Sequence, residues 1–91
     1  SFVDGIGSKA VFPQMFERAK NLVDDALVAD LQSVADAVKS LVESNHVIAE
    51  GAGATSVACA LSGKAGTGKV VCVVSGGNID TAKLAELLVS K

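Results

Sequence analysis

The feature that most constrains the fold of this chain is an unbroken apolar run close to its C-terminus. Residues 70–74 are four valines and one cysteine, and the run ends at Ser75-Gly76-Gly77-Asn78. A half-buried strand alternates apolar and polar residues, whereas a strand covered on both faces is apolar throughout. The run therefore predicts a buried strand of a parallel sheet. Because ligands of such sheets bind beyond the carboxyl ends of the strands, residues 75–78 are the expected binding segment.

Helical spacing of apolar residues accounts for most of the remaining chain. Pro13 suits the first turn of one helix, and Asp30 is well placed to cap the next. A short apolar stretch, residues 26–29, indicates a second strand. Helices that alternate with strands predict an α/β fold, and two or three strands are too few to complete a sheet. The expected fold is thus an incomplete portion of a parallel-sheet three-layer α/β/α domain, with helices on both faces. The expected helices are residues 13–23, 31–44, a segment that begins within 51–56 and ends at Gly63, and 80–88.

Composition excludes several classes of function. The 91 residues carry 8 basic and 10 acidic side chains, a net charge of −2, with no basic face for nucleic acid. No apolar run approaches the roughly 18–20 residues that span a bilayer, and we expect no signal peptide and no membrane partner. Cys59 and Cys72 lie in apolar contexts without metal-type spacing, so they are expected to be buried, reduced thiols. These features favour a cytoplasmic location.

The individual motifs are ambiguous when each is taken alone. SGGN at residues 75–78 matches neither a dinucleotide fingerprint nor a P-loop, and its simplest interpretation is a strand-to-helix turn. EGAGATS at residues 50–56 could serve helix packing only. His46 is expected at the surface near a helix end, and Asp24-Asp25 is most simply a loop that ends a helix. We expect no metal site.

The order of the motifs is more specific than any one of them. EGAGA (residues 50–54), SGK (62–64) and SGGNID (75–80) follow one another, preceded by FVDGIGSK (2–9) and LVDDALVAD (22–30). Together they resemble the C-terminal part of the catalytic domain of the pyridoxal-phosphate-dependent threonine and serine dehydratases. These enzymes belong to the tryptophan-synthase-β-like (fold type II) family. The resemblance covers the whole chain and implies that residues 1–91 form one part of such a domain.

The resemblance also implies which residues bind pyridoxal 5′-phosphate. Ser75 matches the serine whose hydroxyl hydrogen-bonds the pyridine nitrogen of the cofactor. Gly5 matches a glycine that lines the cofactor ring, and Glu50 matches a carboxylate on the substrate side of the ring. Gly76 and Asn78 belong to the same loop as Ser75. A neutral hydroxyl at the ring nitrogen need not protonate it, which favours β-elimination over transamination.

Two parts of the family's active site do not occur in this sequence. They are the motif that carries the Schiff-base lysine and the glycine-rich phosphate loop. No catalytic residue is therefore assigned, and the chain alone is expected to be inactive. The parent enzyme would dehydrate and deaminate L-threonine or L-serine to a 2-oxo acid and ammonia. Its expected partners are an amino-acid substrate, the remainder of the catalytic domain and further copies of the parent in a homo-oligomer.

Two alternatives stay open at this point. One is a serine or hydroxyaspartate racemase or dehydratase of the same family. The other is a stand-alone, non-catalytic α/β module for protein association. The sequence does not discriminate between amino-acid substrates, and it does not reveal metal or effector dependence.

Overall fold

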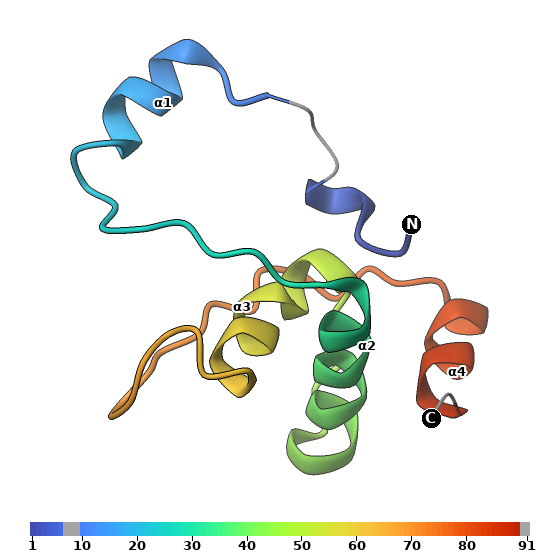
Figure 1. Ribbon diagram of the computed structural model, residues 1–91. Helices are drawn as coiled ribbons and strands as arrows, with labels where there is room; N and C mark the ends of the chain where they lie inside the picture. Colours follow the sequence, from blue (N-terminus) through green and yellow to red (C-terminus); the bar gives the residue numbers. More distant parts are fainter. Residues whose placement is uncertain (7–9, 90–91) are drawn as a thin grey trace.

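The structure is a computed structural model that describes residues 1–6 and 10–89, and these residues form a helical assembly (Figure 1). Helices α2 and α3 lie side by side at its centre, and α4 lies beside α2. Within the described residues there is no β-strand. The elements are, in chain order, the 3₁₀ turn η1 (Asp4–Ile6), α1 (Pro13–Ala19), α2 (Leu31–Ser40), the π-helical turn η2 (Leu41–Asn45), α3 (Gly51–Leu61) and α4 (Thr81–Val89).

The prediction of a parallel-sheet α/β/α fold is wrong for this chain. Residues 70–74, the expected central strand, form a loop in which Val71 is 92% and Val73 74% exposed. Residues 26–29, the other expected strand, also form a loop. A strand requires backbone partners for its N–H and C=O groups. Neither stretch makes a backbone–backbone hydrogen bond within the described part of the chain, so neither has a neighbouring strand with which to form a sheet.

Helix α2 begins where the sequence places it, because Asp30 caps its first turn. The Asp30 carboxylate accepts a hydrogen bond of 2.7 Å from the backbone N–H of Ser33. The helix continues into η2, which ends at His46 in a left-handed conformation with φ 56°. The predicted helix over residues 31–44 is therefore confirmed, although its last turn is wider than an α-helical turn.

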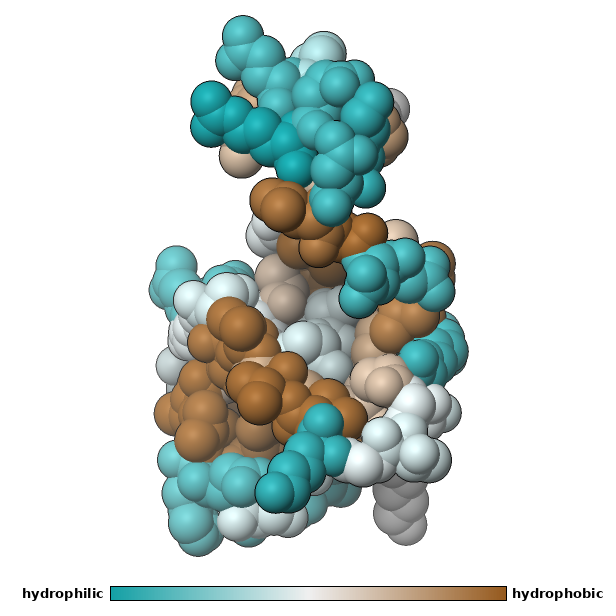
Figure 2. Space-filling model, turned by 90° about the vertical axis from the view of Figure 1, so that its left-hand side faces the viewer, coloured by the Kyte–Doolittle hydropathy of each residue, from teal (hydrophilic) through white to brown (hydrophobic). Residues whose placement is uncertain are grey.

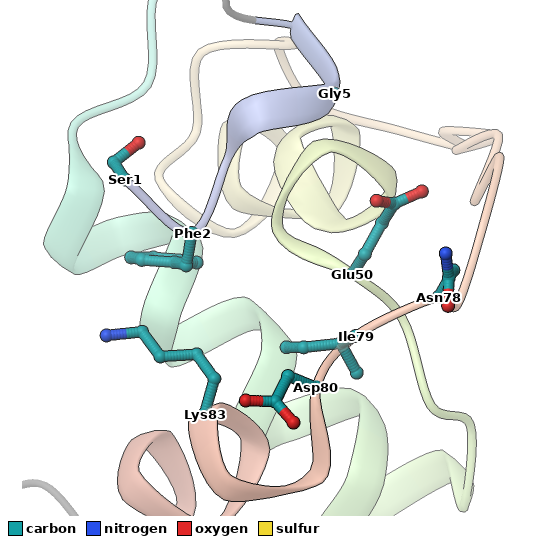
Figure 3. A pocket seen from close by; sticks show the side chains of 8 residues that line it. All are labelled: Ser1, Phe2, Gly5, Glu50, Asn78, Ile79, Asp80 and Lys83. Carbon is teal, nitrogen blue, oxygen red and sulfur yellow. The ribbon is translucent and has the colours of Figure 1, made fainter.

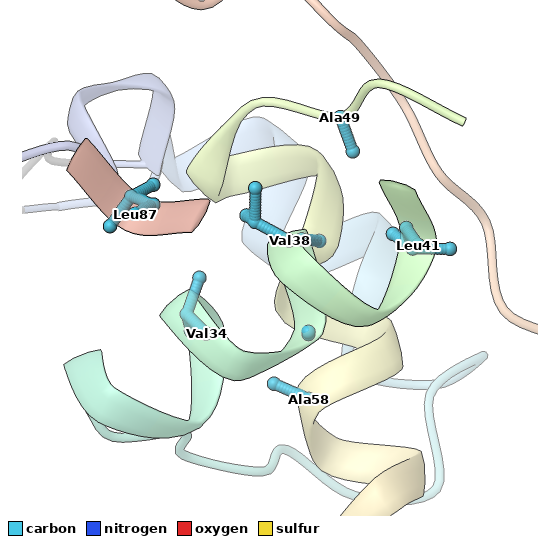
Figure 4. Packing of buried hydrophobic residues seen from close by; sticks show 8 residues of the cluster. Val34, Val38, Leu41, Ala49, Ala58 and Leu87 are labelled. Carbon is cyan, nitrogen blue, oxygen red and sulfur yellow. The ribbon is translucent and has the colours of Figure 1, made fainter. Parts of the chain in front are cut away.

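The core lies between α2 and α3 and is built largely from small side chains (Figure 4). Ala37 and Val38 of α2 are fully buried, and so is Ala54 of α3. Alanines at the contact let the two helix axes approach closely, and the valine fills the space that remains. The buried cluster comprises Val34, Ala37, Val38, Leu41, Ala49, Ala54, Ala58 and Leu87.

Much apolar surface lies outside this core. Helix α1 projects away from the other helices (Figure 1), and none of its residues is buried. Phe12 is 80% and Leu22 83% exposed. Figure 2 shows broad hydrophobic areas on one face of the molecule. The helix predicted over residues 13–23 is correct only for 13–19, since the chain beyond Ala19 has no core to pack against.

A side-chain contact links the loop before α2 to the turn after α3. Lys64 Nζ donates a hydrogen bond to the backbone carbonyl oxygen of Val28. The same ammonium helps to stabilise the ionised carboxylate of Asp30. Lys64 thus connects the SGK turn with the residues that lead into α2. No helix within the described ranges is long and apolar enough to cross a membrane.

The cap at Asp30 leads to a prediction about pH. Hydrogen bonds from the backbone N–H and the hydroxyl of Ser33, with a smaller contribution from Lys64, hold the pKa of Asp30 below its ordinary value of 3.8. The ionised cap therefore stabilises α2 above pH 3.8, and this stabilisation is lost as the pH falls through the lower pKa of the folded state. Thermal unfolding followed by circular dichroism should show a midpoint difference between the native protein and Asp30→Ala that shrinks in acid.

The control is Asp30→Asn, whose amide oxygen can still accept from the Ser33 N–H but does not ionise. We expect this variant to keep most of the stability near neutral pH and to show a weaker dependence on acid. An Asp30→Ala variant as stable as the native protein at pH 7 would contradict the assigned cap.

Candidate functional site

A pocket of about 350 Å³ lies where η1, the start of α3 and the start of α4 meet (Figure 3). Three chain segments that are far apart in the sequence contribute to its lining. Figure 3 shows Glu50 and Asn78 on one side of the pocket, and Phe2 and Lys83 on the opposite side. The lining residues are Ser1, Phe2, Gly5, Glu50, Asn78, Ile79, Asp80 and Lys83.

Glu50 is the residue on which the geometry of the pocket depends. It occupies the N-cap position of α3, but its side chain makes no capping hydrogen bond. Its backbone N–H instead donates to the carbonyl oxygen of Gly76 over 3.0 Å. The carboxylate is consequently available to the pocket.

Two glycines leave the space that the Glu50 carboxylate occupies. A Cβ atom at Gly76 would lie 2.5 Å from Glu50 Oε1, and one at Gly5 would lie 3.7 Å from Glu50 Oε2 and 2.9 Å from the Ala52 Cβ. A side chain at either position would thus crowd Glu50 or the first turn of α3. The carboxylate lies between two glycines that come from opposite ends of the chain.

The structure brings together some of the predicted site residues and separates one of them. Gly5, Glu50 and Asn78 line the same pocket, and Gly76 contacts Glu50 from beside it. Ser75 does not line the pocket. Its side chain is exposed, and among the described residues its hydroxyl has no hydrogen-bond partner.

Sequence reasoning missed Phe2, Asp80 and Lys83 as pocket residues. Lys83 Nζ lies 5.6 Å from the centroid of the Phe2 ring, within the range of a cation–π contact. Lys83 also pairs with Glu86 over 3.4 Å. The spacing of Asp80 and Lys83 was the available signal, because residues three apart at a helix start share a face.

The pocket presents charges of both signs within one small volume. The Glu50 and Asp80 carboxylates can accept hydrogen bonds from an ammonium group, while the Lys83 ammonium and the Asn78 amide can donate to a carboxylate. This combination suits a small zwitterionic molecule. No group of three or more His, Cys, Asp or Glu side chains in the described part of the chain could hold a metal ion.

Comparison with known proteins gives this geometry a context, although no protein-family model matches the chain. An L-threonine ammonia-lyase from Thermotoga maritima is 38% identical over 89 residues, which cover 97% of this chain. The chain is homologous to part of the L-threonine ammonia-lyases. An L-threonine ammonia-lyase from Geobacter sulfurreducens is 34% identical over 87 residues, or 93% of the chain. The catabolic L-threonine dehydratase TdcB from Staphylococcus aureus is 33% identical over 93 residues, or 97% of the chain.

The matches cover 93–97% of this chain but only part of each ammonia-lyase. The chain spans 22% of the Thermotoga and Geobacter proteins and 27% of the Staphylococcus protein. The resemblance that the ordered motifs indicated is therefore confirmed. The chain corresponds to one segment of enzymes about four times as long.

The contact between Gly76 and Glu50 predicts non-additive mutations. Gly76→Ala should lower the free energy of unfolding by about 0.5–1.5 kcal/mol, because the new methyl group would lie 2.5 Å from Glu50 Oε1 and would force the Glu50 side chain out of its present rotamer. In a Glu50→Ala background the collision is absent, so the same substitution should cost much less. Denaturant unfolding of the two single variants and the double variant measures this coupling. Strictly additive costs would show that the carboxylate does not lie against Gly76.

Proposed function

We propose that the chain forms one wall of the active site of a pyridoxal-phosphate-dependent L-threonine ammonia-lyase. The parent would convert L-threonine or L-serine to a 2-oxo acid and ammonia. The observation that carries the proposal is the meeting of Gly5, Glu50 and Asn78 at one pocket, in a chain homologous to such enzymes. Three positions assigned by family resemblance, from three separate segments, converge in space.

The residues present fit one side of the cofactor. The exposed Ser75 hydroxyl is available to hydrogen-bond a ring nitrogen, and the adjacent pocket is wide enough for a small polar substrate. The missing side chains of Gly5 and Gly76 also make room for the Glu50 carboxylate and for the first turn of α3.

Each polar residue of the wall has a role in this proposal. When bound, the cofactor would supply the electron sink that stabilises negative charge at the α-carbon of the substrate. Ser75 would orient the ring through a neutral hydrogen bond that leaves the ring nitrogen unprotonated. The Glu50 carboxylate, held between Gly5 and Gly76, would face the substrate and accept hydrogen bonds from its ammonium or hydroxyl group.

The mixed charges of the pocket support an amino acid as the ligand. Lys83 and Asn78 can bind a carboxylate, while Glu50 and Asp80 can bind an ammonium group. A β-hydroxyl on a short side chain, as in threonine or serine, adds a further hydrogen-bonding group without much volume. We also propose a cytoplasmic location, which the free thiols of the buried Cys59 and the partly buried Cys72 support.

We further propose that the remainder of the catalytic domain covers the apolar surface of this chain. Val71 and Val73 are exposed immediately before the Ser75 segment, and Phe12 and Leu22 are exposed on either side of α1. An apolar surface of this extent is typical of an interface. The relatives contain three quarters of their length beyond the matched segment, which is ample chain to cover it.

The proposal predicts a change of chemistry when Ser75 is replaced. In the full-length protein, Ser75→Asp places a carboxylate at the ring nitrogen, and the opposite charge raises the pKa of that nitrogen. A protonated ring holds negative charge longer, so transamination should gain on elimination. Ser75→Ala should be milder, with the loss of one hydrogen bond of roughly 0.5–1.5 kcal/mol. Cofactor absorbance and the ratio of released ammonia to amino group retained on the cofactor measure both effects.

Ser75→Asp with bound cofactor and unchanged products would contradict the role of Ser75. A native full-length protein that forms no 2-oxo acid from L-threonine or L-serine would contradict the proposed activity itself.

Cysteine labelling tests the proposed cover. Cys59 and Cys72 are replaced by alanine, and a single cysteine is introduced as Val71→Cys or, as a matched control, as Thr67→Cys in the exposed polar loop. We expect the Val71→Cys thiol to react rapidly in the 91-residue chain and at least about tenfold more slowly in the full-length protein, since access limits thiol reactivity. The Thr67→Cys thiol should react rapidly in both. Equal labelling of Val71→Cys in the two proteins would show that residue 71 stays uncovered.

A further inference from the structure

Gly53, in the first turn of α3, meets the backbone of Gly76 at very short range. A Cβ atom at Gly53 would overlap the Gly76 carbonyl oxygen and would lie 3.0 Å from the Gly76 nitrogen. Gly53 is buried and does not line the pocket. The contact is therefore one of backbone against backbone, and any side chain at residue 53 would displace Gly76.

Three further contacts hold the same segment. A Cβ atom at Gly77 would overlap the backbone carbonyl oxygen of Ile48. The Glu50 N–H donates to the Gly76 carbonyl oxygen over 3.0 Å, and Ser56 Oγ donates to the Val73 carbonyl oxygen over 2.9 Å. The loop that carries Ser75 thus runs along the start of α3 with little freedom to shift.

Backbone conformation does not explain why residue 53 is glycine. Among the described glycines, positive φ angles occur at Gly63, Gly66 and Gly68, and Gly53 is not one of them. A glycine within a helix is destabilising relative to alanine, because it loses more conformational freedom on folding. Residue 53 is glycine because its close contact with the Gly76 backbone leaves no room for a side chain.

We propose that Gly53 is a positioning residue for the active-site segment of residues 75–78. Ser75 precedes Gly76, and Asn78 follows Gly77. The position of these two glycines against α3 and the loop before it therefore determines where the Ser75 and Asn78 side chains lie. The position of Gly76 also determines where the Glu50 carboxylate lies, because the two are in contact. The inference rests on the proposed function, because it concerns the placement of groups that face the cofactor and the substrate.

The experiment compares Gly53→Ala with Ala58→Val in the full-length protein. Both substitutions enlarge a buried residue of α3, but Ala58 packs in the α2–α3 core and is not among the neighbours closest to Gly76. The first readout is hydrogen exchange at the Glu50 amide, measured by mass spectrometry on the peptide that contains it. The second is the absorbance of the bound cofactor, together with kcat and KM for L-threonine.

In Gly53→Ala we expect the Glu50 amide to exchange about tenfold faster, because the methyl group breaks its hydrogen bond to Gly76. The cofactor spectrum should shift, and kcat should fall by up to about 100-fold, since small misplacements of active-site groups are costly. Ala58→Val should lower the melting temperature while the Glu50 amide and the spectrum stay native. Gly77→Ala, which pushes the same segment away from Ile48, should reproduce the exchange result if Gly53→Ala does not fold.

Native exchange at Glu50 and a native spectrum in Gly53→Ala would overturn the inference. So would an Ala58→Val variant that shows the same changes, because a general loss of packing would then explain them. A native protein that binds no pyridoxal phosphate would overturn the proposed function alone. In that case the exchange readout still decides whether Gly53 positions the segment.

Discussion

The contact of α2 with α3 through alanine-sized side chains is the constraint on which the rest of the molecule depends. Ala37, Ala54 and Ala58 are at most 1% exposed, and larger side chains there would force the helices apart. The close approach fixes α3, and the start of α3 in turn fixes Glu50 and Gly53. The site is thus built outward from one helix pair, and residues 76–77 contact the start of α3 and the loop that leads into it.

The second half of the site depends on missing side chains. Gly53, Gly76 and Gly77 each place backbone where a Cβ atom would collide with a neighbouring segment. Such contacts contribute little apolar area, so they define a position more than they add stability. The hydrogen bond from the Glu50 N–H to Gly76 attracts the two segments, and the glycines allow their backbones to approach closely.

Local signals in the sequence predict the helices well and the strands badly. Asp30 caps α2 as expected, and Pro13 starts α1, because caps and first turns depend on neighbouring residues only. The apolar run of residues 70–74 indicates correctly that these side chains favour burial. It does not reveal whether a partner exists, and in this chain Val71 is 92% exposed. A strand is a property of at least two segments, and one segment cannot specify it.

The same limit applies to the site: one motif predicts its own residues, but not the contacts that it makes with a second motif. The ordered motifs single out Gly5, Glu50 and Asn78, and the structure places all three at one pocket. Asp80 and Lys83 were missed because each is an ordinary residue of a helix start when taken by itself. Taken alone, EGAGA is compatible with simple helix packing and SGGN with a simple strand-to-helix turn. In the structure the two segments form a single contact, in which Gly53 meets Gly76 and the Glu50 N–H donates to the Gly76 carbonyl oxygen. Because each half requires the other to lack side chains, the two motifs constrain each other physically, and ligand contact is not needed to account for Gly53.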